Sequence, residues 1–117
     1  MSGHEDNSVL EVTLKKNDDV PLLELTGRIV DADVKKFQKK IDQLYKKKFP
    51  EIIVDVSGAS YIDSHGLGTI VYYHTLMQRE KRHLVILNKN RDKSSYLNKL
   101  FELTNLDKVL TIVSHIV

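Results

Sequence analysis

The spacing of apolar residues changes repeatedly along the chain, and this alternation restricts the fold more than any other feature. Residues 10–14 alternate Leu10, Val12 and Leu14 toward one side, which predicts a half-buried strand. A short polar turn separates them from a second apolar stretch, residues 20–27, that ends in glycine. Two strands joined by so short a turn predict an antiparallel pair.

Helical and strand-like segments then alternate to the end of the chain. From residue 33 the apolar residues recur at helical spacing, and Asp31 or Asp33 is placed to cap that helix. Further strands are predicted at residues 51–56 and 83–88, a strand or a strand-helix remnant at residues 109–117, and further helices from residue 64 and over residues 94–106. Residues 57–60 ("SGAS") are predicted to form a loop of small residues before the second helix.

The predicted order is therefore β-β-α-β-α-β-α-β. Strands that alternate with helices form an α/β sheet with the helices packed on it, and the opening pair makes the sheet mixed. We expect about four to five strands in a single domain over residues 9–117, preceded by a flexible N-terminus over residues 1–8. The length of 117 residues favours one domain with a sizeable core.

Composition excludes several classes of protein. The chain has no cysteine, which excludes a disulfide scaffold, a cysteine nucleophile and a thiolate metal site. The net charge of +2 does not by itself indicate nucleic acid. Seven lysines lie between Lys35 and Lys48, where a solvated helix face is favoured over a patch for an anionic partner.

Nothing in the sequence indicates a membrane. The first residues, "MSGHEDNS", lack the features of a signal peptide, and no apolar run approaches the roughly 20 residues of a membrane span. We therefore expect a cytoplasmic protein.

The segment "YIDSHGLG", residues 61–68, contains the residues with the most chemical potential. A serine nucleophile is disfavoured because Ser64 and His65 are adjacent, so their side chains point in different directions at a helix start. The G-x-S-x-G elbow of serine hydrolases is also missing. We therefore do not expect an enzyme.

Cofactor and metal sites are disfavoured for similar reasons. Gly66 and Gly68 form only a G-x-G, with Val71 where a dinucleotide-binding motif has its third glycine, and no P-loop is present. A tight turn with close backbone approach explains these glycines better. The five histidines form no ligand pair at helical or hairpin spacing, apart from the distant possibility of His65 with Asp63, so no metal is expected.

A helix cap is the simplest role for this segment. Asp63 or Ser64 precedes the apolar helical run, where a side-chain oxygen can accept a hydrogen bond from an exposed helix N–H. The same helix end favours an anion, so a phosphate on Ser64, with a charge of about −1.5 to −2, is expected there. Asp63 would oppose that phosphate, and a switch needs this kind of balance.

The stretch "IIVDVSGASYIDSHGLGTIV" resembles the central segment of the STAS domains, and most closely the bacterial anti-sigma factor antagonists. The family pattern is a hydrophobic strand, a short loop and then D-S-x-G-L-G at a helix start. Five residues match it position for position: Asp63, Ser64, Gly66, Leu67 and Gly68. The resemblance extends over nearly the whole chain, including "LELTGRIVDADV" and "LNKLFELTNLDKVLTI".

The resemblance implies a partner-switching protein. In that family the serine after the aspartate is phosphorylated by a serine kinase that is also an anti-sigma factor; the unphosphorylated form binds this kinase, and a phosphoserine phosphatase restores it. Ser64 is then the phospho-acceptor, and the kinase, not this chain, binds ATP. No cofactor, nucleic acid or small-molecule substrate is expected. The partner-binding residues implied are Asp31, Asp63, Ser64, His65, Gly66, Leu67 and Gly68.

Two departures from the family pattern stand out. Where the family has G-E-[IL]-D, this chain reads Gly27-Arg28-Ile29-Val30-Asp31, so the acid comes one residue late and Arg28 replaces the glutamate. His65 replaces the small or hydroxyl residue that is usual at this position.

Three alternatives remain open at this stage. The first is a STAS module that serves as a scaffold or regulatory subunit of a signalling or transport complex without switching. The others are a small enzyme that uses Ser64 and a histidine, and nucleic-acid binding by the lysine-rich helix.

Overall fold

The computed structural model describes residues 9–116, which form one α/β domain around a five-stranded mixed sheet. The flexible N-terminus predicted for residues 1–8 lies outside the described residues. The strands are β1 (Glu11–Asn17), β2 (Val20–Ile29), β3 (Glu51–Ile62), β4 (His83–Leu87) and β5 (Thr111–Val113). The helices are α1 (Val34–Lys46), α2 (Ser64–Arg79) and α3 (Tyr96–Leu103), with short 3-10 turns η1 (Asp31–Asp33) and η2 (Leu106–Lys108).

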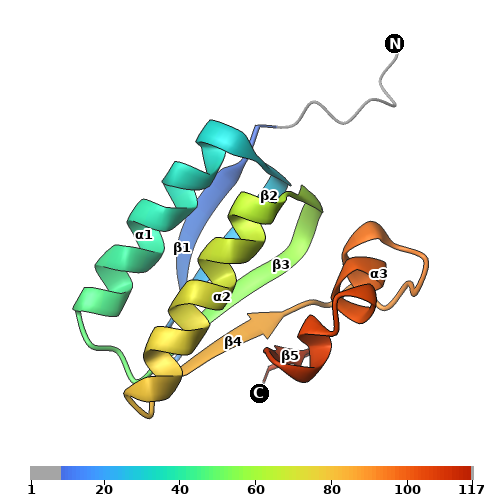
Figure 1. Ribbon diagram of the computed structural model, residues 1–117. Helices are drawn as coiled ribbons and strands as arrows, with labels where there is room; N and C mark the ends of the chain where they lie inside the picture. The colour runs from blue at the N-terminus through green and yellow to red at the C-terminus, as the bar shows by residue number, and fades with distance from the viewer. Residues whose placement is uncertain (1–8, 117) are drawn as a thin grey trace.

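The predicted order and fold class are confirmed. The strands lie in the order β1-β2-β3-β4-β5; β1 is antiparallel to β2, and the other neighbours are parallel. Because α1 and α2 each connect two parallel neighbours, both helices run back along the sheet in the same direction. Both therefore begin at the edge where β2 and β3 end, and they lie side by side across one face (Figure 1).

The main core lies between the sheet and these helices. It contains Leu23 and Leu25 of β2, Phe37 and Ile41 of α1, and Ile70 of α2, all fully buried. α3 lies to the side of the α1/α2 pair and adds Leu97 and Phe101 to the same core (Figure 1). The opposite face of the sheet carries a smaller cluster of four buried residues: Leu22, Ile53, Val85 and Leu87.

Several predictions about individual elements are wrong. Leu14 was expected to point inward, but 53% of it is exposed. β1 is an edge strand, and α1 reaches it near its start, where Lys36 donates to the carbonyl of Leu10. The "SGAS" segment is not a loop, because Gly58 and Ala59 pair with Thr26 and Gly27 and so continue β3.

The second strand also runs beyond its predicted end. Gly27 was expected to close it, but β2 continues to Ile29 through an irregularity in register between Gly27 and Arg28, where Gly27 has a φ of 100°. The last segment, residues 109–117, was predicted as a strand or a strand-helix remnant; within the described residues the strand spans 111–113, and residue 117 lies outside them. Neither Asp31 nor Asp33 caps α1 through its side chain.

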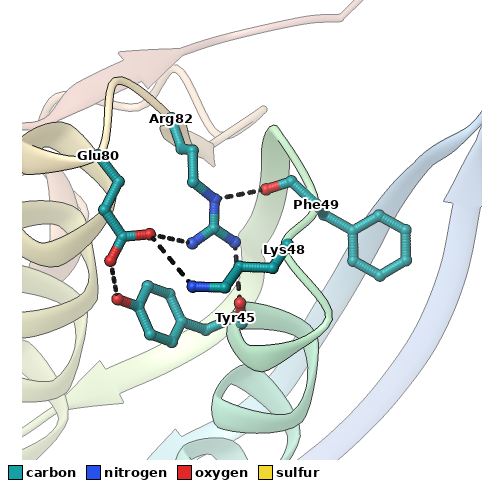
Figure 2. Close-up of polar contacts among 5 residues, drawn as sticks. All are labelled: Tyr45, Lys48, Phe49, Glu80 and Arg82. Atoms are coloured by element: carbon teal, nitrogen blue, oxygen red, sulfur yellow. Dashed lines mark hydrogen bonds and ion pairs between the residues drawn. The ribbon is translucent and has the colours of Figure 1, made fainter.

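The ends of α1 and α2 far from Ser64 are joined by Arg82 (Figure 2). Its guanidinium donates from Nε to the carbonyl of Phe49 at 2.8 Å, and from Nη2 to that of Tyr45 at 2.9 Å. It also pairs with Glu80 at 2.7 Å, and the Tyr45 hydroxyl donates to the other oxygen of Glu80. Arg82 is only 9% exposed. It binds one carbonyl in the last turn of α1 and one in the loop that follows, and so holds the two helices together at this end.

None of the helices between residues 9 and 116 has the length and apolar character needed to cross a bilayer.

Candidate functional site

Asp63 connects two separate segments at the start of α2. Its Oδ1 accepts from the N–H of Gly66 at 2.9 Å, which makes it the N-cap of the helix. Its Oδ2 accepts from the N–H of Asp31 at 2.9 Å, and its own N–H donates to the carbonyl of Ile29 at 3.1 Å. One carboxylate therefore fixes the start of α2 against the end of β2.

The Asp63 carboxyl is held in its charged form. Partial burial raises the pKa of this group, but the N–H groups of Asp31 and Gly66 and the nearby His65 together outweigh that effect, so the pKa lies below its ordinary value. A fixed negative charge therefore lies directly beside Ser64 at neutral pH.

The structure brings Asp31 next to Asp63, but through its backbone. Asp31 has a φ of 50°, in the left-handed region, and this conformation turns its N–H toward the Asp63 carboxylate. Its side chain is exposed. The acid that comes one residue late in the family pattern thus lies at the rim of the site.

Ser64 is the first residue of α2, and its side chain is exposed. Within residues 9–116 its hydroxyl has no hydrogen-bond partner, because Asp63 provides the cap. The ring of the neighbouring His65 turns toward α1, where its Nε2 lies 3.2 Å from Nε2 of Gln38. His65 is therefore not oriented to take a proton from Ser64, and a serine nucleophile gains no support.

The two glycines of the motif have different environments. Gly66 is buried, and an added Cβ would lie 2.7 Å from Cγ1 of Ile62 and 2.8 Å from Cγ2 of Ile29. Close packing of α2 on the sheet therefore requires glycine at this position. Gly68 is exposed, and an added Cβ would meet nothing within 4 Å. No contact within the described residues therefore requires glycine at position 68.

An open groove runs between α1 and α2 from Ser64, and we call it the α1/α2 groove. Its volume is about 710 Å³. From α1 it is lined by Lys35, Gln38, Lys39 and Asp42. From α2 it is lined by Ser64, His65, Gly68, Thr69, Tyr72 and Tyr73.

Polar side chains hold the walls of this groove together. Nε2 of Gln38 donates to Oγ1 of Thr69 at 3.0 Å, and the Thr69 hydroxyl donates to the carbonyl of His65 at 3.1 Å. Further along, the Tyr73 hydroxyl donates to Asp42 at 2.8 Å. Burial and this hydrogen bond to Asp42 raise the pKa of Tyr73, so its hydroxyl stays protonated. These bonds join α1 to α2 along the groove.

A model of the STAS domain matches residues 11–117. The chain belongs to the STAS domain family. The match covers nearly the whole chain, so it confirms the resemblance suggested by the D-S-x-G-L-G motif.

Solved structures show the same fold. An anti-sigma factor antagonist from Mycobacterium paratuberculosis superposes with a TM-score of 0.72 at 14% identity, over 92% of this chain and 87% of that one. A Thermotoga maritima protein provisionally described as an anti-sigma factor antagonist gives 0.72 at 25% identity, over 90% and 87%. The phosphorylated form of SpoIIAA, a Bacillus cell fate determinant, gives 0.65 at 17% identity, over 88% and 91%. No curated protein sequence matches the chain.

An aromatic cluster that sequence reasoning missed flanks the other side of Asp63 in this STAS domain. The rings of Tyr61 and Tyr96 stack with centroids 4.7 Å apart, and the Arg28 guanidinium lies 5.1 Å from the centroid of Tyr61. The Tyr96 hydroxyl donates to the carbonyl of Ile62 at 3.1 Å. Arg28, which replaces the family glutamate, therefore lies over a tyrosine ring.

Tyr72 and Gln38 were also missed. Tyr72 is 58% exposed and continues the line of Ser64 and Gly68 along α2 at intervals of four residues. That spacing is visible in the sequence and could have indicated a shared helix face. Gln38 had no such signal, because it meets His65 only where two helices pack. Leu67 is half-buried against the core.

Proposed function

We propose that this STAS domain is an anti-sigma factor antagonist that works by partner switching. In its unphosphorylated form it binds a serine kinase that is also an anti-sigma factor, in the cytoplasm. Phosphorylation of Ser64 releases it, and a phosphoserine phosphatase restores the binding form. The observation that carries the proposal is the exposed and unpaired Ser64 hydroxyl beside the fixed, charged Asp63.

The phosphoryl transfer takes place within the kinase complex. The Ser64 Oγ forms a bond to the γ-phosphorus of ATP while the bond from that phosphorus to the bridging oxygen breaks, and ADP leaves. The hydroxyl proton passes to a base of the kinase. This chain supplies the acceptor hydroxyl and binds no nucleotide itself.

The exposed side of α2 is the proposed docking face. Ser64, Gly68 and Tyr72 lie along it, and Gly68 lets a partner approach the helix backbone closely. His65 and the exposed Asp31 lie at its edge, and Leu67 adds a half-buried apolar contact. Asp63 and Gly66 hold this face in place, the first through its hydrogen bonds and the second through close packing.

A likeness to SpoIIAA supports the proposal. That protein has been solved in an unphosphorylated form, which superposes with a TM-score of 0.66 at 16% identity over 91% of this chain and 90% of that one, and in a phosphorylated form. The fold therefore accommodates both phosphorylation states in a relative.

A quantitative pull-down from the source cell's lysate tests the proposal. Wild-type protein, Ser64→Asp and a charge-matched control, Gln43→Glu, serve as baits; Gln43 is exposed on α1 and outside the groove. We expect wild type and Gln43→Glu to hold a serine kinase that Ser64→Asp loses. The captured kinase should transfer phosphate from ATP to Ser64, located by mass spectrometry, and should leave Ser64→Ala unmodified.

Identical captures by all three baits would contradict the switch. They would favour the alternative of a STAS scaffold or regulatory subunit, for which the displaced acid at Val30 and Asp31 is the specific observation. Labelling of Ser64 by a fluorophosphonate would instead indicate an enzyme.

A further inference from the structure

The turn at the start of α2 does not offer a phosphate the site that a helix N-terminus usually provides. The N–H of Gly66 is already bound by the Asp63 carboxylate, and the N–H of His65 also interacts with that carboxylate. The charged carboxylate also repels a second anion from this position. A phosphate on Ser64 therefore competes with Asp63 for the N–H groups of this turn.

The side chains that line the same cavity as Ser64 include two lysines. Lys35 and Lys39 lie one helical turn apart on α1 and line the α1/α2 groove opposite Ser64. Among the described residues neither makes an ion pair, whereas Lys36 pairs with Asp33 at 3.9 Å and Lys46 with Asp42 at 2.9 Å.

The carboxylate in the groove does not compete for these lysines. Asp42 is bound by Lys46 and by the Tyr73 hydroxyl, and both hydrogen bonds lower the pKa of its carboxyl, so its charge is already compensated. The other titratable groups near the Ser64 end are His65 and Tyr72, within the groove, Asp63, behind Ser64, and the exposed Asp31 at the rim of the site. Lys35 and Lys39 are thus the lysines of the groove that no carboxylate of the described residues pairs with.

We propose that the α1/α2 groove is an intramolecular receptor for the Ser64 phosphate, with Lys35 and Lys39 as its cationic ligands. No covalent bond forms in this step: the phosphate monoester of Ser64 turns away from Asp63 and makes charge-assisted hydrogen bonds to the two ammonium groups. The proposal deepens the partner switch and rests on it for its biological meaning.

The receptor explains how phosphorylation can act without unfolding the domain. A phosphate held by Lys35 and Lys39 covers the start of the docking face on α2 and neutralises the wall that faces it. Release of the partner then follows from occupation of the groove, and no element of the sheet has to move. Lysines that sequence reasoning treated as a solvated face gain a specific role at only two of their seven positions.

The test measures the second pKa of the phosphate by ³¹P NMR. Phosphoserine is inserted at position 64 during translation, so neither kinase nor partner is needed. Three proteins are compared: the otherwise wild-type chain, Lys35→Gln/Lys39→Gln, and the control Lys40→Gln/Lys47→Gln. The control removes the same charge from the same segment at exposed positions outside the groove.

Nearby cations favour the doubly charged phosphate, so removal of Lys35 and Lys39 should raise its second pKa. We expect a rise of roughly 0.5 pH units or more, and less than about half of that in the control, because exposed charges farther away are screened. Equal changes in the two double variants, or no change in either, would overturn the receptor. Amide spectra of each variant establish that the fold is retained.

This outcome is independent of the pull-down. A phosphate that senses Lys35 and Lys39, together with an absent kinase, would support the receptor and contradict the partner switch. A captured kinase, together with a phosphate whose second pKa does not change when these lysines are replaced, would support the partner switch and contradict the receptor.

Discussion

Both ends of the α1/α2 pair are polar, but they differ in how far their polar side chains are bonded within the chain. At the end far from Ser64, Arg82 is buried and donates hydrogen bonds to Tyr45, Phe49 and Glu80 of the same chain (Figure 2). At the other end both carboxylate oxygens of Asp63 accept hydrogen bonds, yet the Ser64 hydroxyl remains exposed and unpaired beside the α1/α2 groove. The difference indicates which end stabilises the fold and which is available to a partner.

The largest effect on stability should come from replacing Arg82 at the end of the helix pair far from Ser64. Arg82→Met removes the donor to the carbonyl of Phe49, one of the two donors to the carbonyl of Tyr45, and the nearer of the two cations that pair with Glu80. We expect a loss of about 2–3 kcal/mol in the free energy of unfolding, measured by urea denaturation. Partner binding by the folded protein should be unchanged, because the docking face lies at the other end.

Arg79→Met is the matched control, since Arg79 is an exposed arginine three residues earlier. An exposed charge away from structural partners contributes little, so we expect a change within about 0.5 kcal/mol. Similar losses for both variants would show that the Arg82 contacts do not hold the helices together.

A smaller effect should separate the two glycines of the motif. Gly66→Ala places a methyl group against Ile62 and Ile29 and should lower the free energy of unfolding by about 1–2 kcal/mol. Gly68→Ala meets no atoms and should raise it by up to about 1 kcal/mol, because alanine favours helix. Urea denaturation of both variants measures the difference in sign.

The same pair tests the docking face. We expect Gly68→Ala to weaken binding to the captured kinase despite its greater stability, because its methyl group stands on the face of α2 that the partner approaches. A stabilised Gly68→Ala with wild-type affinity would remove Gly68 from the proposed face.

The smallest effect concerns the charge of Asp63. Its pKa is lowered in the folded protein, so its contribution to stability is present above the unfolded value, about 3.9, and is lost as pH falls through the folded value. Asp63→Asn keeps a good N-cap but removes the charge. The wild-type stability should therefore decline more steeply than that of Asp63→Asn below about pH 5, by an amount on the order of 1 kcal/mol or less.

Stability curves from pH 3 to pH 7 provide the measurement, and carboxyl NMR of Asp63 provides an independent reading of its pKa. Parallel curves for the two proteins, with an Asp63 carboxyl that titrates at its ordinary value, would contradict the role of its hydrogen bonds to Asp31 and Gly66.

The sequence by itself determined the order of elements, the mixed α/β class and the STAS motif. These features depend on neighbours along the chain: period two or continuous apolar runs in strands, period 3.6 in helices, and an N-cap acting over three residues. The same local pattern predicted that Asp63 or Ser64 is the N-cap of the second helix, and in the structure the N-cap is Asp63.

Only the tertiary structure decided what each residue of the motif can do. The second oxygen of Asp63 binds Asp31, which is 32 positions away, and Gly66 is required because Ile29 of another strand lies against it. The exposure of Leu14 depends on β1 being an edge, and the continuation of β3 through "SGAS" depends on pairing with β2.

The α1/α2 groove also depends on the tertiary structure. Ser64 belongs to α2 and the two lysines to α1, and their placement in one cavity depends on how these helices pack side by side on the sheet (Figure 1). Local patterns set which segments form helices and strands, because their energies depend on near neighbours. The site arises from contacts between segments far apart in sequence, whose energies exist only once the sheet has assembled.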